Sequence, residues 1–476
     1  GMSVTYQLIP GLVWSDGAPF SAEDVRFTWQ FITDPAASST TAAIYGSIED
    51  VEVVDPTTVT LRFKQPTPGW YNLFSTAFGG QILPKHLLES VMGAAARDAE
   101  FNLMPIGTGP YRVSEFRPGD VVLYEINENF REPSKPYFER VELKGGGDAS
   151  AAARAALETG ETDWAWNLQV EKSILESFAG SETGVLLSSP GTGIERIVIN
   201  FTDPNIEIDG ARSEPGTTHP FFSDLAVREA FALSTDRETI ASELYGPSGT
   251  ATANLLVGPA RFVSPNTDFI FDVDSAGDKL DGAGWLLEDG KRTKNGTQMS
   301  VLFQTSVNPL RQKTQEICKQ AWEQLGIATE IKAVDAGVYF SSDPGNPETY
   351  AHFYADLQMG TSSVTSPYPI NFMALYKSDN PAVDLPQKAN QWSGRNQNRW
   401  VNEEYNQLYQ QALTELDPDR QVDVFVAMND LIVNEVVDIA LVHRTNVSGA
   451  NARLKGYEQS PWTSDVHDIA NWYMEE

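Results

Sequence analysis

The segment of residues 3–35 most constrains the fold, because it combines a strand, a tight turn and a capped helix. Apolar residues alternate with polar ones over 4–8, a pattern typical of a half-buried strand. Asp16-Gly17 predicts a tight turn, since glycine takes a positive φ without steric cost. Ser21 and Asp24 have the spacing of a capping box, in which side chains satisfy free backbone groups where a helix begins.

Strand and helix patterns then alternate along the whole chain. Apolar periodicity and turn or cap residues predict the following elements: a hairpin over 44–64, a strand from 111, a helix over 149–158, a buried strand over 194–201, helices after 224 and 236, a strand over 299–305, a helix from 309, a strand over 327–334, helices over 403–416 and 418–435, and a strand over 438–442. This alternation indicates an α/β protein, and 476 residues suffice for two or three lobes.

Charge and hydropathy narrow the classes of protein to consider. The formal net charge is −31, which opposes binding to phosphate backbones and makes nucleic acid a poor partner. A hydrophobic content of 41% is too high for a disordered chain, and no apolar run reaches membrane-spanning length. The single cysteine, Cys318, rules out an internal disulfide, and its place on an apolar helical stripe indicates a core residue.

Motifs for catalysis or metal binding are weak. The five histidines lack HxxxH and HExxH spacing, and the chain has no GxSxG or SxxK motif. The glycines at 107 and 109 lack the order of a phosphate loop. We therefore expect a binding site with no catalytic residue, no metal and no cofactor. A carbohydrate hydrolase with an acidic, aromatic cleft stays open, because sequence does not show carboxylate separations, as does a scaffold or adhesin using the acidic surface.

Several separated strings resemble one known family. They are WSDGAPFSAEDV from residue 14, VEVVDPTTVTLRFKQPTP from 51, PIGTGPYRVSEF from 105, GETD from 160, VREAFALSTDR from 227 and LGI from 325. Together they resemble the bacterial extracellular solute-binding proteins of peptide, nickel and oligosaccharide ABC importers, the oligopeptide-binding-protein-like family 5. The resemblance follows the chain in order over nearly its whole length.

The resemblance implies a periplasmic-binding-protein-like α/β fold, with two main lobes and an extra smaller lobe around a ligand cleft. Lobe II is expected over 3–115, lobe I over 116–202 and 445–476, and lobe III over 203–444. In the family, an export signal and the first strands of lobe I precede the segment that opens this chain. We expect both to be absent here, with Gly1-Met2 an expression scar.

The implied function is capture and not catalysis. Hinged lobes would close on a peptide-like or oligosaccharide solute and present it to the permease subunits of an ABC transporter. The resemblance also implies an extracytoplasmic location, in the periplasm or on the outer face of the membrane, and a monomer.

Two segments predicted as strands contain the first two groups of candidates for ligand contact. Trp164 and Trp166 follow the GETD turn, alternate with an alanine and would share one face of a strand; Asn167 comes next. Glu195 and Arg196 lie where the family's strand brings side chains to the ligand, so one of the two is expected to face the cleft.

The third candidate is the stretch 354–372, which resembles the cleft-lining segment of lobe III. Peptide binders of the family carry Gly-Trp there and then an aspartate that holds the peptide's ammonium group. Here threonine replaces the tryptophan, and small residues replace the aspartate, which puts free-amine peptides in doubt. The expected ligand contacts of this stretch are Met359, Gly360, Thr361, Ser362, Ser363 and Tyr368. Trp392, farther along the chain, is expected to stack on the ligand together with Tyr368.

Overall fold

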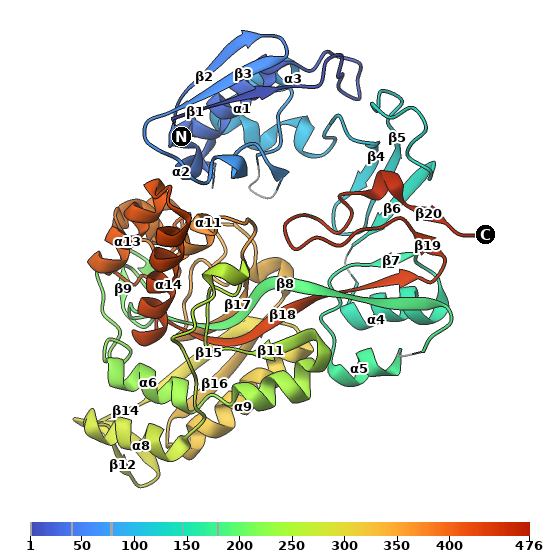
Figure 1. Cartoon of the computed structure of the whole chain (residues 1–476). Helices are drawn as coiled ribbons and strands as arrows, with labels where there is room; N and C mark the ends of the chain where they lie inside the picture. Colours follow the sequence, from blue (N-terminus) through green and yellow to red (C-terminus); the bar gives the residue numbers. More distant parts are fainter. Residues whose placement is uncertain (1, 40, 77–79, 146, 179) are drawn as a thin grey trace.

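The computed structural model describes residues 2–39, 41–76, 80–145, 147–178 and 180–476. It confirms the mixed α/β class: small sheets at the N-terminal end and beside the C-terminus flank a large sheet that carries helices on both faces (Figure 1).

The N-terminal region is a three-stranded sheet of order β1-β3-β2 packed on α1. Its capping box is confirmed: Ser21 Oγ accepts from the Glu23 amide, and Asp24 Oδ2 accepts from the Ser21 amide at 2.8 Å. Gly17 takes the predicted positive φ, 89°. The elements are β1 (Ser3–Gln7), α1 (Ala22–Thr33), α2 (Ala42–Tyr45), β2 (Ile48–Asp55), β3 (Thr58–Phe63) and α3 (Lys85–Leu88).

A second region follows, built on the three-stranded sheet β4-β5-β6. The C-terminal hairpin β19 and β20 lies beside it, so the end of the chain returns to this region (Figure 1). Its elements are β4 (Tyr111–Arg117), β5 (Val121–Ile126), β6 (Arg140–Lys144), α4 (Ala149–Arg154), β7 (Trp164–Ala165), α5 (Lys172–Ser177), β19 (Leu454–Lys455) and β20 (Tyr473–Met474).

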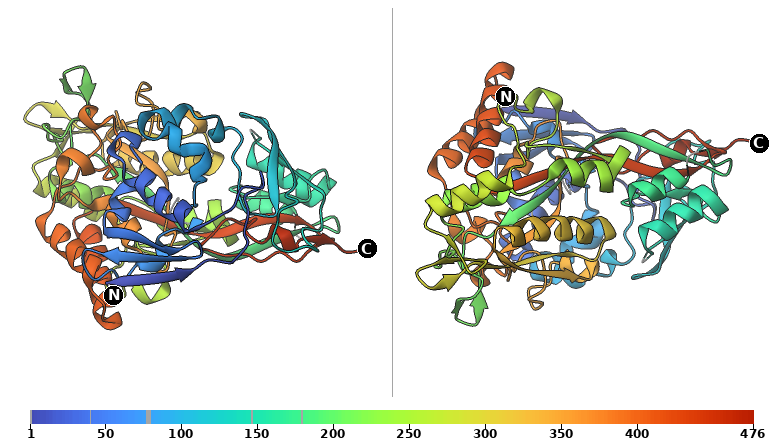
Figure 2. Two further views of the ribbon diagram at one scale, coloured as in Figure 1. Left: turned by 90° about the horizontal axis from the view of Figure 1, so that it is seen from above. Right: turned by 90° about the horizontal axis from the view of Figure 1, so that it is seen from below.

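The central sheet has seven strands in the order β11-β18-β8-β17-β15-β16, with β7 added beside β18. Two antiparallel strands, β8 and β18, run from the second region into this sheet and are 16 and 14 residues long (Figures 1 and 2). The strands are β8 (Gly184–Ile199), β11 (Gly249–Ala251), β15 (Ser300–Ser306), β16 (Ala328–Val334), β17 (Leu357–Ser363) and β18 (Asp438–Asn451).

Helices cover both faces of the central sheet. One core joins sheet residues such as Ile197 and Met359 to α6, α8 and α9, and buries Cys318 as predicted. A second core joins Ile194 and Ala440 to α11, α13 and α14 on the other face. The helices are α6 (Leu225–Leu233), α7 (Arg237–Thr239), α8 (Val273–Gly282), α9 (Pro309–Gln324), α10 (Ala336–Tyr339), α11 (Ile370–Met373), α12 (Pro381–Asp384), α13 (Glu403–Thr414) and α14 (Pro418–Asn434).

The short strands fall into two peripheral groups. A three-stranded sheet consists of β12 (Leu286–Glu288), β13 (Lys291–Lys294) and β14 (Thr297–Gln298), and a two-stranded ladder consists of β9 (Glu207–Ile208) and β10 (Ala211–Arg212).

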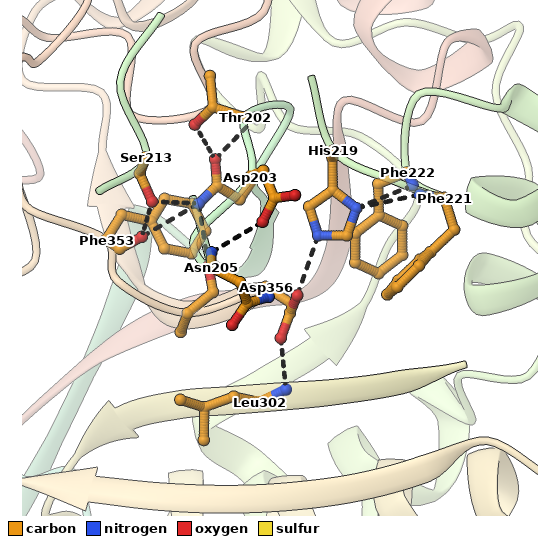
Figure 3. A network of polar contacts seen from close by, with 12 residues as sticks. Thr202, Asp203, Asn205, Ser213, His219, Phe221, Phe222, Leu302, Phe353 and Asp356 are labelled. Carbon is orange, nitrogen blue, oxygen red and sulfur yellow. Dashed lines mark hydrogen bonds and ion pairs between the residues drawn. The ribbon is translucent and has the colours of Figure 1, made fainter. Parts of the chain in front are cut away.

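The loop of residues 202–220 is tied to the sheet by a buried polar network (Figure 3). His219 Nδ1 accepts from the Phe222 amide at 3.1 Å, so its Nε2 donates to Asp356 Oδ1, at 3.0 Å. Asp356 Oδ2 accepts in turn from the Leu302 amide of β15. Each polar group has a partner, as burial requires, so we assign this histidine to the scaffold.

The structure extends two predicted strands. The strands expected over 194–201 and 438–442 are the apolar parts of β8 and β18, which run on through residues rich in serine, threonine, asparagine and glycine. Backbone pairing between two long strands does not depend on that apolar signal. The expected lobe divisions after 115 and 444 fall inside β4 and β18.

Candidate functional site

A cavity of about 670 Å³ lies where all three regions meet. The N-terminal region contributes Thr76 and Gln81, the central sheet and its helices contribute one wall, and the second region contributes the rest. The loop between β19 and β20 reaches into the middle of the molecule and supplies residues 460–465 (Figure 1). The volume is within the range of about 300–1,000 Å³ that is typical of small-molecule sites.

The floor of the cavity is the middle of the antiparallel ladder between β8 and β18, where the pairing is irregular. The register of β18 against β8 shifts between Arg444 and Asn446, and both residues line the cavity. A bulge bends its strand and changes where side chains point. Opposite the bulge, a Cβ atom on Gly191 would lie 2.2 Å from the Arg444 carbonyl oxygen, so the close backbone approach requires glycine.

A buried ion pair supports one side of the floor. Glu195 of β8 accepts from Arg311 Nε at 2.8 Å and from Nη2 at 3.3 Å, and Arg311 lines the cavity from the first turn of α9. Burial acts to raise the pKa of Glu195, but the charge and hydrogen bonds of Arg311, together with Arg444 and Thr361, outweigh it and hold this pKa below its usual range. Glu195 is therefore a carboxylate.

Thr361 of β17 joins this ion pair to a second arginine. Its hydroxyl donates to Glu195 Oε2 and accepts from Arg311 Nη2 at 3.0 Å and from Arg444 Nη1 at 3.2 Å. Arg444 Nη2 donates to Asn167 Oδ1 at 3.0 Å. Asn167 has a φ of 52°, a left-handed conformation that asparagine tolerates better than most residues and that positions its amide here.

The loop of residues 460–465 and two aromatic side chains complete the lining. Asp465 accepts from Ser448 Oγ of β18 at 2.6 Å, and Trp462 lies near it on the same loop. Phe340 lines the wall of the central region, and the Arg311 guanidinium lies 5.5 Å from the centre of its ring. The cavity thus offers charged, hydrogen-bonding and aromatic surfaces together, as sites for polar organic ligands do.

Among the predicted ligand contacts, Trp166, Asn167, Thr361 and Ser363 all lie in the lining of this cavity. Trp166 is 68% exposed, an unusual state for tryptophan. Trp164 does not share its face: β7 ends at Ala165, and Trp164 packs against Trp472 at a ring distance of 4.7 Å.

The other predicted contacts lie outside the lining. Glu195 sits directly below it, through Arg311 and Thr361. Arg196 points to the opposite face of the sheet, where it pairs with Asp438 and meets Ser362. The rest are packed elsewhere: Met359 in the core with α9, Gly360 buried near Phe340 and Tyr350, Tyr368 in the core with α14, and Trp392 stacked on His352.

Sequence reasoning missed Arg311, Phe340, Arg444, Trp462 and Asp465. Arg444 and Asp465 follow the apolar part of β18, in segments without periodicity that could reveal a facing direction. Arg311 had a usable signal, because it follows the Asn308-Pro309 cap and so lies in the first turn of a helix.

Within the described ranges, the structure brings no three histidine, cysteine or acidic side chains together as a metal site would. In the same residues, no helix combines the length and apolar character needed to cross a bilayer.

Comparison with known proteins gives one matching family. The profile of the bacterial extracellular solute-binding proteins, family 5, middle region, matches residues 1–383. A Brucella ovis protein named as an ABC transporter peptide-binding protein is 27% identical over 352 residues, which are 73% of this chain and 61% of the relative. The chain thus spans less than two thirds of that relative. The glutathione-binding protein GsiB of Escherichia coli is 24% identical over 467 residues, covering 97% of this chain and 82% of GsiB.

Solved structures share the fold. NikZ of Campylobacter jejuni, in complex with Ni(L-His), has a TM-score of 0.82 at 23% identity, covering 99% of this chain and 88% of that one. The oligopeptide-binding protein AppA of Bacillus subtilis, in complex with a nonapeptide, has a TM-score of 0.82 at 22% identity, covering 100% and 88%. At these identities the likeness shows the fold alone, and it confirms the multi-lobed architecture expected from the sequence.

Proposed function

Because the chain belongs to the bacterial extracellular solute-binding proteins of family 5, we propose that it captures a small peptide-like solute outside the cytoplasm and delivers it to the permease of an ABC importer. The observation that carries this proposal is the cavity where three regions of the chain meet. Its floor lies on β8 and β18, the two strands that join the second region to the central sheet. A ligand there contacts every region at once, so its binding free energy favours their closed arrangement.

The lining suits a ligand with polar and apolar parts. Trp166, Phe340 and Trp462 offer flat apolar surfaces, while hydroxyl and amide groups between them offer hydrogen bonds. Peptides have this mixed character. Relatives of this chain are named for binding peptides and glutathione, which supports the same ligand class here.

We propose capture without chemistry. Glycoside hydrolysis needs two carboxyl groups on either side of the bond that breaks. In the part of the chain that the structure describes, Asp465 is the one carboxylate in the cavity lining, and Glu195 below it is held by Arg311. A peptide or oligosaccharide recovered after long incubation should therefore have an unchanged mass, measured by mass spectrometry. Hydrolysis products would instead support the hydrolase alternative.

Thermal unfolding with tripeptide and oligosaccharide pools tests the proposal, because a ligand that binds the folded state alone raises the melting temperature. We expect a rise with tripeptides, and a loss of about tenfold or more in affinity in Trp166→Ala, measured by calorimetry. Tyr137→Ala, which removes an exposed aromatic outside the cavity lining, is the control. Equal affinity in both variants, or no rise with any pool, would contradict the proposal.

A further inference from the structure

Three charged side chains line the cavity in the described part of the chain, and they differ in how their charges are compensated. Arg311 forms its ion pair with Glu195. Asp465 accepts a hydrogen bond from Ser448. Arg444 has no carboxylate within ion-pair distance among the described residues, although it lies beside the Glu195–Arg311 pair.

The groups that meet Arg444 are neutral acceptors. Thr361 gives its hydroxyl proton to Glu195, so only its lone pairs are available to Arg444. Asn167 presents its amide oxygen, and Gln169 presents its own in the amide orientation that satisfies it. These three residues fix the guanidinium in place, and none supplies a negative charge.

The positive charge of Arg444 is not neutralised by a paired carboxylate. Burial lowers the pKa of Arg444, with Glu195 opposing that effect and Arg311 adding to it. Arginine nonetheless stays protonated at neutral pH, so the cavity holds a partly desolvated cation without its own counter-ion. Specific backbone features hold Arg444 in this place: a register shift follows it in β18, and Asn167, which accepts its hydrogen bond, has a left-handed backbone conformation.

On the premise of the proposed function, we propose that the solute carries a carboxylate and that Arg444 binds it. A planar guanidinium binds a carboxylate through strong, charge-assisted hydrogen bonds, often two in parallel. In this protein the ligand is therefore anchored by its acid group, at the register shift between β8 and β18. This differs from anchoring through an ammonium group on the 361–363 segment, which has no carboxylate.

The surroundings favour a carboxylate over a phosphate. One unpaired cation matches one negative charge, and the nearby Asp465 carboxylate and the overall charge of −31 oppose a dianion. Asp465 also provides a place where a free amine could gain a weaker, second interaction.

The test uses one pool of tripeptides in four end chemistries: both ends free, N-acetylated, C-amidated and both ends blocked, with inorganic phosphate as a separate probe. We expect the free and N-acetylated pools to raise the melting temperature, and amidation to weaken binding by about tenfold to a hundredfold. Equal binding of amidated and free-acid pools would overturn the carboxylate anchor while leaving peptide capture intact. Binding of no pool would remove both proposals, and saturable binding of phosphate alone would overturn the carboxylate assignment.

Variants show whether Arg444 causes the preference for free-acid over amidated peptides. In Arg444→Gln the preference for the free acid over the amide should disappear, whereas a merely structural loss would weaken both alike. Arg453→Gln, which removes an exposed arginine outside the cavity lining, should keep the full preference. Asp465→Asn should weaken free-amine probes and leave the acetylated ones unchanged. A preference for the free acid that survives in a folded Arg444→Gln would overturn the assignment.

Discussion

Glu195 and Arg196 are neighbours on β8, and they serve opposite faces of the same sheet. Arg196 belongs to a sealed face, where both members of its ion pair with Asp438 are almost fully buried. Glu195 belongs to the cavity face, where its partner Arg311 reaches the lining. Both sites pair an arginine with a carboxylate, so the difference in their roles comes from what surrounds them.

The sealed face satisfies its polar groups internally. Asp438 accepts from Arg196, from Tyr376 Oη at 2.8 Å and from Asn398 Nδ2 at 2.7 Å, while Arg196 also donates to Ser362. The cavity face has two arginines for one carboxylate. Glu195 is already paired with Arg311, and Arg444 lies beside that pair. A network in which every polar group has a partner stabilises the fold, whereas the network of the cavity face leaves the Arg444 guanidinium able to bind a ligand.

The largest effect is expected on the sealed face. Asp438→Asn leaves the Arg196 cation buried without a counter-ion, and breaking such a pair costs about 3–5 kcal/mol. Urea denaturation should show this loss of unfolding free energy, with Asp289→Asn in an exposed turn as the matched control. A loss no greater than the control's would mean that the sealed face is less closed than the structure shows.

A smaller effect that depends on pH is expected on the cavity face. Glu195→Gln should cost about 1–3 kcal/mol at pH 7, because Arg311 keeps its hydrogen bonds to the Ser306 and Thr361 hydroxyls and reaches the cavity lining. The folded-state pKa of Glu195 is depressed, so its contribution is complete above the usual carboxyl pKa of about 4.3 and is lost as pH falls below it.

Unfolding curves of wild type and Glu195→Gln at pH 7 and near pH 3 measure that contribution. The difference in unfolding free energy between the two proteins should narrow on acidification, because Glu195 binds a proton more readily in the unfolded wild type than in the folded one. A gap that stays constant would show that the lost stability comes from packing and not from the charge of Glu195.

The smallest effect concerns the hydroxyl that joins the two arginines. Thr361→Val keeps the shape of the side chain but removes the donor to Glu195 and the acceptor for Arg444, at a cost of about 1 kcal/mol. Thr365→Val, which alters the same lining without breaking those bonds, should cost less by the same denaturation assay. Equal losses would mean that Thr361 does not couple the two arginines.

Local signals predicted the parts of the fold that local physics controls. Four local predictions are confirmed: the capping box of α1, the hairpin of β2 and β3, the start of α9 at Pro309 and the burial of Cys318. Each depends on residues a few positions apart. The sequence also suggested that Glu195 and Arg196 would face different environments, since side chains alternate along a strand.

The candidate site was only partly accessible to the same reasoning. Trp166, Asn167, Thr361 and Ser363 were chosen and lie in the cavity lining, whereas Tyr368 and Trp392 were chosen as aromatics and are packed against other aromatic rings. Aromatic content marks a binding surface and a core equally well, and neither composition nor periodicity separates the two.

By itself, the sequence determined the family, the α/β class and where most helices and strands lie, because caps, turns and apolar periods act over short distances. The tertiary structure alone decided which charges meet. Four cavity residues come from different parts of the chain and are brought together at the irregular part of the β8–β18 ladder: Arg311, Thr361, Arg444 and Asp465. Those distant neighbours decide whether the charge of an arginine is paired with a carboxylate. Electrostatic interactions depend on distance in space and not on separation along the chain.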